Sequence, residues 1–232
     1  MTISDRFSEV IRRKDEAAVR SGRRPEDVTL MAVTKTHGAD EINQAIAAGA
    51  TDIGENRVQE LLEKYDKVDP VRWHLIGHLQ TNKVKSVVGK VVMIHSVDSL
   101  KLAREIDKRS EAAGIVTDVL IEINSAMEDT KSGIDPQNLR QITEEITAEC
   151  KHVRIRGLMC IPPIAADPED ARPYFKEAAS LFKEMQGWDL PEERIKADVL
   201  SMGMSGDFEV AIEEGATIVR VGSSIFGPRN YR

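Results

Sequence analysis

The chain has 232 residues, a formal net charge of −7 at pH 7, and 41% hydrophobic and 31% charged residues. This length is enough to bury a sizeable core, and the composition is that of an ordinary globular protein. The acidic balance argues against nucleic acid or an anionic membrane as the main partner, because both attract basic surfaces.

The cysteine content and the apolar runs bear on the cellular compartment. The two cysteines, Cys150 and Cys160, are too few for a disulfide framework. No apolar run approaches the length of a membrane span, and the N-terminus carries no apolar segment like that of a signal peptide. We therefore expect a cytoplasmic protein that does not associate with membranes.

The chain begins with a predicted helix and then alternates between short apolar runs and longer amphipathic stretches. Ile3, Phe7, Val10 and Ile11 have helical spacing, and Gly22 is placed to end that helix. We interpret the apolar runs as eight strands, which cover residues 28–33, 51–54, 72–77, 91–97, 118–124, 153–159, 198–203 and 217–222.

Helices with recognisable ends separate the predicted strands. Apolar residues at helical spacing occur in 58–65 and in 139–146. Two Asp-Pro pairs, at 135–136 and 167–168, have the pattern of an N-cap followed by a proline in the first turn. Glycines that could act as C-terminal caps are Gly49, Gly114 and Gly215.

Alternating strands and helices favour a parallel sheet, because parallel strands need crossover connections. Eight such units close as a (β/α)8 barrel, and this chain length lies within the range of that fold. A doubly wound open sheet is the alternative on the pattern alone. No linker-like segment divides the chain, so we predict one domain over residues 1–232, an α/β fold with a TIM barrel and an extra N-terminal helix.

Two Gly/Ser-rich loops follow the last two predicted strands. They read SMGMSGDF over 201–208 and RVGSSIFG over 220–227, and a helix is expected to start near Asp207. Small residues let the backbone approach a ligand, and their amides and hydroxyls suit a phosphate. Either loop alone is a weak signal, but TIM barrels often bind phosphate at these two positions. We therefore predict a phosphate site there.

Lys35 follows the first predicted strand, which neighbours the last strand when a barrel closes. Many lysines at strand ends are simply solvated, and that is one interpretation of Lys35. A neutral lysine beside a phosphate site could instead form a Schiff base with an aldehyde. Arg220, placed against a pyridine nitrogen, would keep that nitrogen unprotonated, because a fixed cation disfavours a second positive charge. An ion pair at the end of the barrel is the alternative interpretation of Arg220.

Six motifs follow one another along nearly the whole chain. They are AVTKTH (32–37), IGENRVQE (53–60), WHLIGHLQTNK (73–83), EDTKSGI (128–134), RGLMCIPP (156–163) and SMGMSGDFEVAIEEGATIVRVGSSIFG (201–227). This series closely resembles the YggS/PROSC family of pyridoxal-phosphate-binding homeostasis proteins. The resemblance implies a single (β/α)8 barrel similar to the N-terminal domain of bacterial alanine racemase, with pyridoxal 5'-phosphate held as a Schiff base on Lys35.

The same resemblance assigns further residues to the cofactor. Arg220 would face the pyridine nitrogen, and Asn56 would lie near the ring. Arg57, Cys160 and Glu122 depart from the residues more usual in the family, but none of them is assigned to cofactor binding. The residues implied to surround the phosphate are Ser201, Gly203, Ser205, Gly222 and Ser223.

The expected function is therefore intracellular vitamin B6 homeostasis. The protein would buffer or deliver pyridoxal 5'-phosphate without catalysis, with pyridoxal-phosphate-dependent apo-enzymes as candidate recipients. The alternative is an amino-acid racemase, which needs acid/base groups on both faces of the substrate. Enzymes of the alanine racemase type take the second group, a tyrosine, from an extra C-terminal domain and a partner subunit. None of Tyr65, Tyr174 and Tyr231 is predicted to face the mouth, and the chain ends soon after strand 8, so we expect a monomer without racemase activity.

Two further chemistries need to be considered. A class I aldolase acting on a sugar phosphate could share the Schiff-base lysine and the phosphate site, but its lysine would normally lie deeper in the barrel beside carboxylates. His74 and His78 flank a strand end and lack the glutamate of an H-E-x-x-H motif. We interpret them as core or rim histidines and expect no metal site.

Overall fold

The barrel is closed, as predicted. The structure is a computed structural model that describes residues 1–125, 133–163 and 166–228. Its strands pair in chain order, all in parallel, and β1 pairs with β8, so the open-sheet alternative is wrong. The strands are β1 (Thr29–Val33), β2 (Asp52–Glu55), β3 (Arg72–Leu75), β4 (Met93–Val97), β5 (Thr117–Ile123), β6 (Val153–Cys160), β7 (Ile195–Ser201) and β8 (Ile218–Val221).

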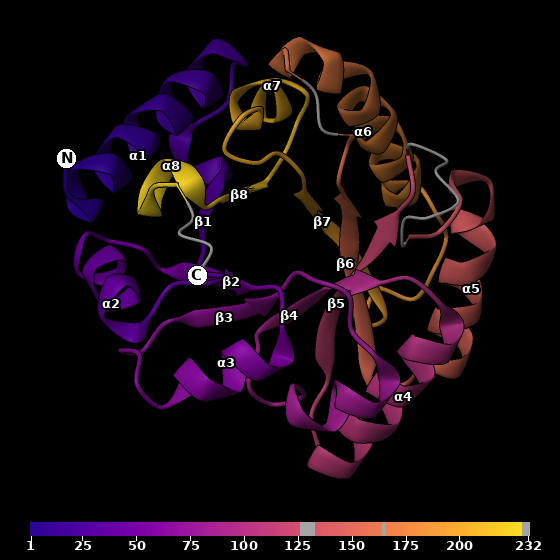
Figure 1. The fold of residues 1–232 in the computed structure, drawn as a ribbon. Coiled ribbons are helices and arrows are strands. Elements are labelled where there is room, and N and C mark those ends of the chain that lie inside the picture. Colours follow the sequence, from indigo (N-terminus) through magenta and orange to yellow (C-terminus); the bar gives the residue numbers. More distant parts are fainter. Residues whose placement is uncertain (126–132, 164–165, 229–232) are drawn as a thin grey trace.

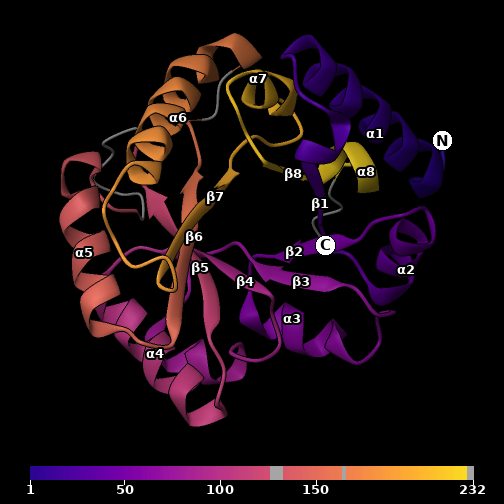
Figure 2. The ribbon, with the colours of Figure 1, turned by 180° about the vertical axis from the view of Figure 1, so that it is seen from behind.

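The helices form an outer ring around these strands, as Figures 1 and 2 show from opposite sides. A 3-10 segment, η2 (Thr81–Ser86), takes the place of a full helix between β3 and β4. No helix in the described part of the chain is long and apolar enough to cross a membrane. The helices are α1 (Ile3–Arg20), α2 (Ala39–Ala47), α3 (Val58–Tyr65), α4 (Leu100–Ala113), α5 (Leu139–Glu149), α6 (Arg172–Gln186), α7 (Phe208–Glu213) and α8 (Ser223–Phe226).

The predicted N-terminal helix is present as α1. Thr2 and Asp5 start it with a capping box, in which each side chain accepts the other residue's backbone N–H. Gly22, at φ 73°, follows its end in the left-handed conformation that glycine tolerates best. The buried side of α1 packs against α2, α7 and α8, outside the junction where β1 closes on β8 (Figure 1).

The two Asp-Pro pairs begin helical structure, but each starts with a 3-10 turn. These turns are η3 (Pro136–Asn138), before α5, and η4 (Pro168–Ala171), before α6. In both pairs the aspartate carboxylate accepts the backbone N–H two residues later, at 2.8 and 2.9 Å. The predicted caps are therefore confirmed, and the tighter first turn was missed.

The inside of the barrel is filled by two kinds of side chain. One is a compact apolar cluster made of Met31, Val33, Ile76, Met93, Leu120, Met159, Val199 and Ile218. The other is polar and buried: Asp52, His74, His95, Ser201 and Arg220 are all at most 3% exposed. Buried polar groups of this kind need hydrogen-bond partners, and their contacts lead to the candidate site.

Candidate functional site

A cavity of about 320 Å³ opens where β1, β2 and β8 end. TIM barrels bind their ligands at this end of the strands, and small-molecule sites typically measure about 300–1,000 Å³. We call it the mouth cavity. Its apolar lining is Val33, Ile76, Ile161 and Met204, and its polar or small lining is Lys35, Asn56, Ser205, Gly206, Arg220, Gly222 and Ser223. Six of the eight predicted cofactor residues thus meet here, whereas Ser201 and Gly203 do not line the cavity.

Lys35 lies in a tight turn directly after β1, and its side chain is half-buried. The next residue, Thr36, has φ 69°, an uncommon conformation for a residue other than glycine. Its backbone N–H donates to Glu60 Oε2 at 2.8 Å, and the Thr34 N–H donates to the Gly54 carbonyl at 3.0 Å. Contacts on both sides of Lys35 therefore hold the turn that presents it.

A buried ionic network lies behind the turn. Glu55 Oε1 accepts hydrogen bonds from Lys64 Nζ at 2.7 Å and from Thr34 Oγ1 at 2.6 Å. Lys64 also donates to the Thr34 carbonyl at 3.0 Å. Burial raises the pKa of Glu55 despite these contacts. The Lys64 amine is thus engaged in supporting the turn. Among the described lysines, Lys35 lines the cavity.

Asn56 follows β2 and is held by the close approach of the next loop. A Cβ atom on Gly77 would lie 2.3 Å from the Asn56 carbonyl oxygen, so only glycine fits there. The side-chain Oδ1 of Asn56 is buried and has no hydrogen-bond partner among the described residues. A buried acceptor left unpaired costs about 1–3 kcal/mol. Asn56 is therefore suited to accept a hydrogen bond from a ligand in the cavity.

The two predicted phosphate loops come together across the cavity. Ser205 Oγ accepts hydrogen bonds from the backbone N–H groups of Gly222 and Ser224, at 3.1 and 3.4 Å. A Cβ atom on Gly222 would lie 3.3 Å from the Val33 carbonyl oxygen, closer than most side chains tolerate. The hydroxyls of Ser205 and Ser223 and the converging amides form a small polar wall, which has the donor groups a phosphate needs.

Gly203 and Ser201 lie behind this wall. Gly203 has φ 89°, and a Cβ atom there would lie 2.5 Å from the Ala211 Cβ. Its carbonyl accepts the Arg220 backbone N–H at 3.0 Å. Ser201 is fully buried, and its Oγ accepts a hydrogen bond from Arg220 Nη1 at 2.7 Å. Both residues support the site from behind, and their direct contact with a phosphate remains a prediction.

Arg220 is buried at the base of the mouth cavity, with 3% of its surface exposed. Its Nη2 donates to the Cys160 carbonyl at 2.9 Å. Burial lowers its pKa, although an arginine in a protein remains protonated. The charges of Cys160, Glu122 and Asp207 act to raise its pKa, against the effect of burial. An ion pair at the end of the barrel stays the alternative interpretation of Arg220.

The two histidines behave as core and rim residues, as expected. His74 is buried and both of its ring nitrogens are hydrogen-bonded. His78 is 58% exposed and lies 3.3 Å from Asp98. In residues 1–125, 133–163 and 166–228 there is no group of three or more His, Cys, Asp and Glu side chains that could hold a metal ion.

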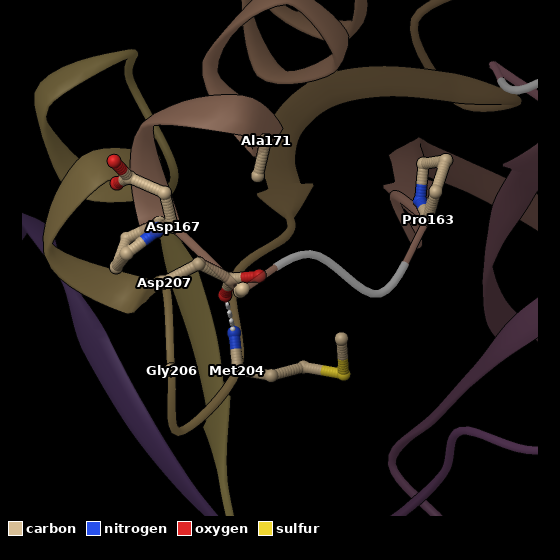
Figure 3. Close-up of a pocket in the computed structure, with 8 residues that line it drawn as sticks. Pro163, Asp167, Ala171, Met204, Gly206 and Asp207 are labelled. Atoms are coloured by element: carbon tan, nitrogen blue, oxygen red, sulfur yellow. Dashed lines mark hydrogen bonds between the residues drawn. The ribbon is translucent and has the colours of Figure 1, made fainter.

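A second cavity of about 190 Å³ adjoins the mouth cavity and shares Met204 and Gly206 with it. Figure 3 shows the Asp207 carboxylate accepting the backbone N–H of Met204, at 2.5 Å. Burial raises the pKa of Asp207. α7 begins at the next residue, as predicted, and Asp207 folds the loop back onto itself.

Comparison with known proteins identifies the chain. Residues 15–230 match the family model for the N-terminal domain of alanine racemase. The pyridoxal phosphate homeostasis protein of Aquifex aeolicus is 47% identical over the full length of both chains. The chain belongs to the pyridoxal phosphate homeostasis protein family. The homeostasis protein of Pseudomonas aeruginosa is 37% identical, over 99% of this chain and 97% of that protein.

Solved structures agree with this family assignment. PipY of Synechococcus elongatus PCC7942, solved with pyridoxal phosphate (PLP) bound, is 35% identical with a TM-score of 0.82, over 97% of this chain and all of PipY. An alanine racemase of Streptomyces lavendulae is 17% identical with a TM-score of 0.70, over 97% of this chain and 58% of the racemase. The second comparison shows a shared fold. The resemblance found in the sequence is thus confirmed, although most of the motif at 128–134 lies outside the described residues.

Proposed function

We propose that this chain binds pyridoxal 5'-phosphate in the mouth cavity, with the cofactor held as a Schiff base on Lys35. One observation carries the proposal: the barrel brings an amine, a buried guanidinium and a Gly/Ser wall into one cavity, from positions as distant as 35 and 223. The unpaired Oδ1 of Asn56 fits the same ligand, since it offers an acceptor beside the ring. The PLP-bound structure of PipY, at 35% identity, supports the choice of cofactor.

Each lining residue then has a defined task. Lys35 would hold the cofactor through its amine, which can condense with an aldehyde to give an imine and one released water. Ser205 and Ser223 would bind the phosphate through their hydroxyls, and Gly222 would let it approach the backbone. Arg220 would face the pyridine nitrogen and disfavour its protonation, because it is a fixed cation. When bound, the cofactor supplies an electron sink, which an arginine partner weakens relative to a carboxylate.

This arrangement favours storage or delivery of the cofactor over catalysis. Racemisation needs a second acid/base group opposite the lysine. In the described part of the chain, neither Tyr65 nor Tyr174 lines the cavity, and Tyr231 lies outside the described residues. We infer that the chain acts as one cofactor-binding domain over residues 1–232, in the cytoplasm, as a monomer, and passes its cofactor to apo-enzymes.

A titration with pyridoxal phosphate tests the proposal. Wild-type protein is expected to develop the visible absorbance band of an imine, and the Lys35→Ala variant is expected to lose it. Lys196→Ala is the matched control, because Lys196 is 64% exposed at the start of β7, away from the mouth cavity. A wild-type protein without the band, or a Lys35→Ala variant that keeps it, would contradict the proposal.

Catalysis is tested separately on the loaded protein. Racemase activity would exchange the α-hydrogen of alanine for deuterium in heavy water, and we expect no exchange above that of free pyridoxal phosphate. A protein that holds pyridoxal phosphate should purify yellow, whereas a class I aldolase should purify colourless.

A further inference from the structure

A continuous line of buried polar side chains runs through the barrel to Arg220. Arg220 Nη1 lies 2.7 Å from Ser201 Oγ, which lies 3.1 Å from His95 Nδ1. His95 Nε2 lies 3.0 Å from His74 Nδ1, and His74 Nε2 lies 2.9 Å from Asp52 Oδ1. We call these five residues the core chain.

The core chain crosses the barrel along its length. Asp52 is the first residue of β2, and Ser201 is the last residue of β7. The core chain therefore leads from near the start of the strands toward the mouth. The interior of such a barrel is usually filled with branched apolar side chains. Polar side chains this deeply buried destabilise a fold unless every donor and acceptor is paired. The hydrogen bonds that join the five residues of the core chain can all form in only one arrangement of the hydrogens.

The two ends of the chain determine the direction of its hydrogen bonds. Arg220 can only donate, so Ser201 Oγ accepts from it. At the other end, burial acts to raise the pKa of Asp52, but hydrogen bonds from His74, Arg72 and the Thr51 hydroxyl lower it to about 2. Asp52 is therefore an ionised acceptor at neutral pH, and His74 Nε2–H donates to it.

The two ends also determine which atoms carry the hydrogens in the middle of the core chain. His74 Nδ1 accepts from His95 Nε2–H, and His95 Nδ1 accepts from the Ser201 hydroxyl. Burial lowers the pKa of His95 well below its usual value, so its ring is neutral. Every hydrogen bond then points from Arg220 toward Asp52. A doubly protonated His74 would reverse the His74–His95 and His95–Ser201 hydrogen bonds. The Ser201 hydroxyl hydrogen would then have no acceptor within the core chain.

We propose that Asp52, His74 and His95 are positioning residues, which act through Ser201 to hold the Arg220 guanidinium in one orientation toward the mouth cavity. Ser201 Oγ and the Cys160 carbonyl bind its two terminal nitrogens, which together fix the guanidinium plane. The inference rests on the proposed function, in which Arg220 faces the ring nitrogen of pyridoxal phosphate. It also explains why Ser201 lies beside Arg220 and outside the cavity.

Nitrogen NMR of the ¹⁵N-histidine-labelled full-length protein, with and without pyridoxal phosphate, is the first test. At pH 8 we expect His74 and His95 each to carry a hydrogen on Nε2 and none on Nδ1. A hydrogen on Nδ1 of either ring would overturn the inference. Since the tautomers can be measured without cofactor, this result is separate from whether pyridoxal phosphate binds.

The Asp52→Asn substitution should reverse the direction of the hydrogen bonds in the core chain, while the side chain keeps almost the same shape. Arg72 also donates to Asp52, at Oδ2, so an asparagine would turn its oxygen toward Arg72 and its NH₂ toward His74. Both rings must then move their hydrogen to Nδ1. We expect this tautomer switch, together with about fivefold to tenfold faster release of pyridoxal phosphate, the effect of one weakened hydrogen bond.

Two further variants complete the test. Asp118→Asn removes a carboxylate that pairs with Arg154 and Arg156 and lies outside the core chain, and it should leave the tautomers and the release rate unchanged. Ser201→Ala removes the contact to Arg220 without touching Asp52, and it should speed release to a similar extent. If the tautomers switch in Asp52→Asn but release is unchanged, or if Ser201→Ala releases at the wild-type rate, the positioning role is overturned.

Discussion

Asp52 shows how the barrel interior changes the acid–base properties of a single residue. Its pKa falls to about 2, because hydrogen bonds from His74, Arg72 and Thr51 outweigh the effect of burial, which alone would raise it. An unfolded aspartate has a pKa of about 3.9. A carboxylate whose pKa is lower in the folded state stabilises the fold above its unfolded pKa, and that contribution is lost as the pH falls through the folded pKa.

Unfolding of the Asp52→Asn variant as a function of pH tests this account. We expect the wild type to be more stable than the variant by about 2 kcal/mol at pH 7, and the difference to shrink between about pH 4 and pH 2. Urea unfolding of both proteins across this pH range measures it. Other carboxylates titrate in both proteins and so cancel, and a difference that stays constant down to pH 2 would disprove the account.

At the scale of elements, the loop between β7 and α7 depends on Gly203. Its φ of 89° strains any other residue, and an added Cβ would lie 2.5 Å from the Ala211 Cβ and 3.0 Å from the Phe208 Cα. We expect Gly203→Ala to reduce the free energy of unfolding by about 1–3 kcal/mol. It should also weaken cofactor binding, because the same loop carries Ser205.

Gly206→Ala is the matched control in the same loop. No heavy atom lies within 4 Å of a Cβ at Gly206, and its φ is not positive. Its free energy of unfolding, measured in urea, should equal that of the wild type within error. Equal stability of the Gly203→Ala and Gly206→Ala variants would show that Gly203 is not required for the loop.

The elements themselves were largely predictable, because short apolar runs and helical spacing are local patterns. The residues at which strands begin and end were less predictable. The strand predicted over 198–203 is β7 (Ile195–Ser201). The predicted start was too late, because exposed Lys196 interrupts the apolar pattern, and the strand ends before Gly203, where the chain turns. The strand predicted over 72–77 ends at Leu75, since Gly77 must approach Asn56 closely. The second error arises from a contact between separate segments, which a local pattern does not contain.

The same limit applies to the candidate site. Lys35, Arg220 and the Gly/Ser loops could be proposed from the sequence because each follows or ends a strand. The contacts of His95 with His74 and Ser201 could not, since they join strands that are up to 106 residues apart and depend on how the strands tilt around the barrel. The network of Glu55 and Lys64 behind Lys35 was missed for the same reason.

For the molecule as a whole, the closed barrel predicts unreactive thiols. Cys150 and Cys160 are free and at most 1% exposed, and burial raises the pKa of each to about 11. The thiolate is the reactive form. We expect neither cysteine to react with Ellman's reagent in the native protein at pH 8, and both to react in guanidinium chloride. A thiol that reacts at once in the native protein would contradict the buried positions.

The central claim is that Lys35 holds pyridoxal phosphate at the barrel mouth. The most direct measurement is to add the cofactor, reduce the C=N bond with borohydride, digest the protein and locate the pyridoxyl group by mass spectrometry. We predict that Lys35 carries the group, and that Lys64, engaged by Glu55, and the distant Lys196 remain unmodified. A pyridoxyl group on another lysine, or none on the protein, would contradict the claim.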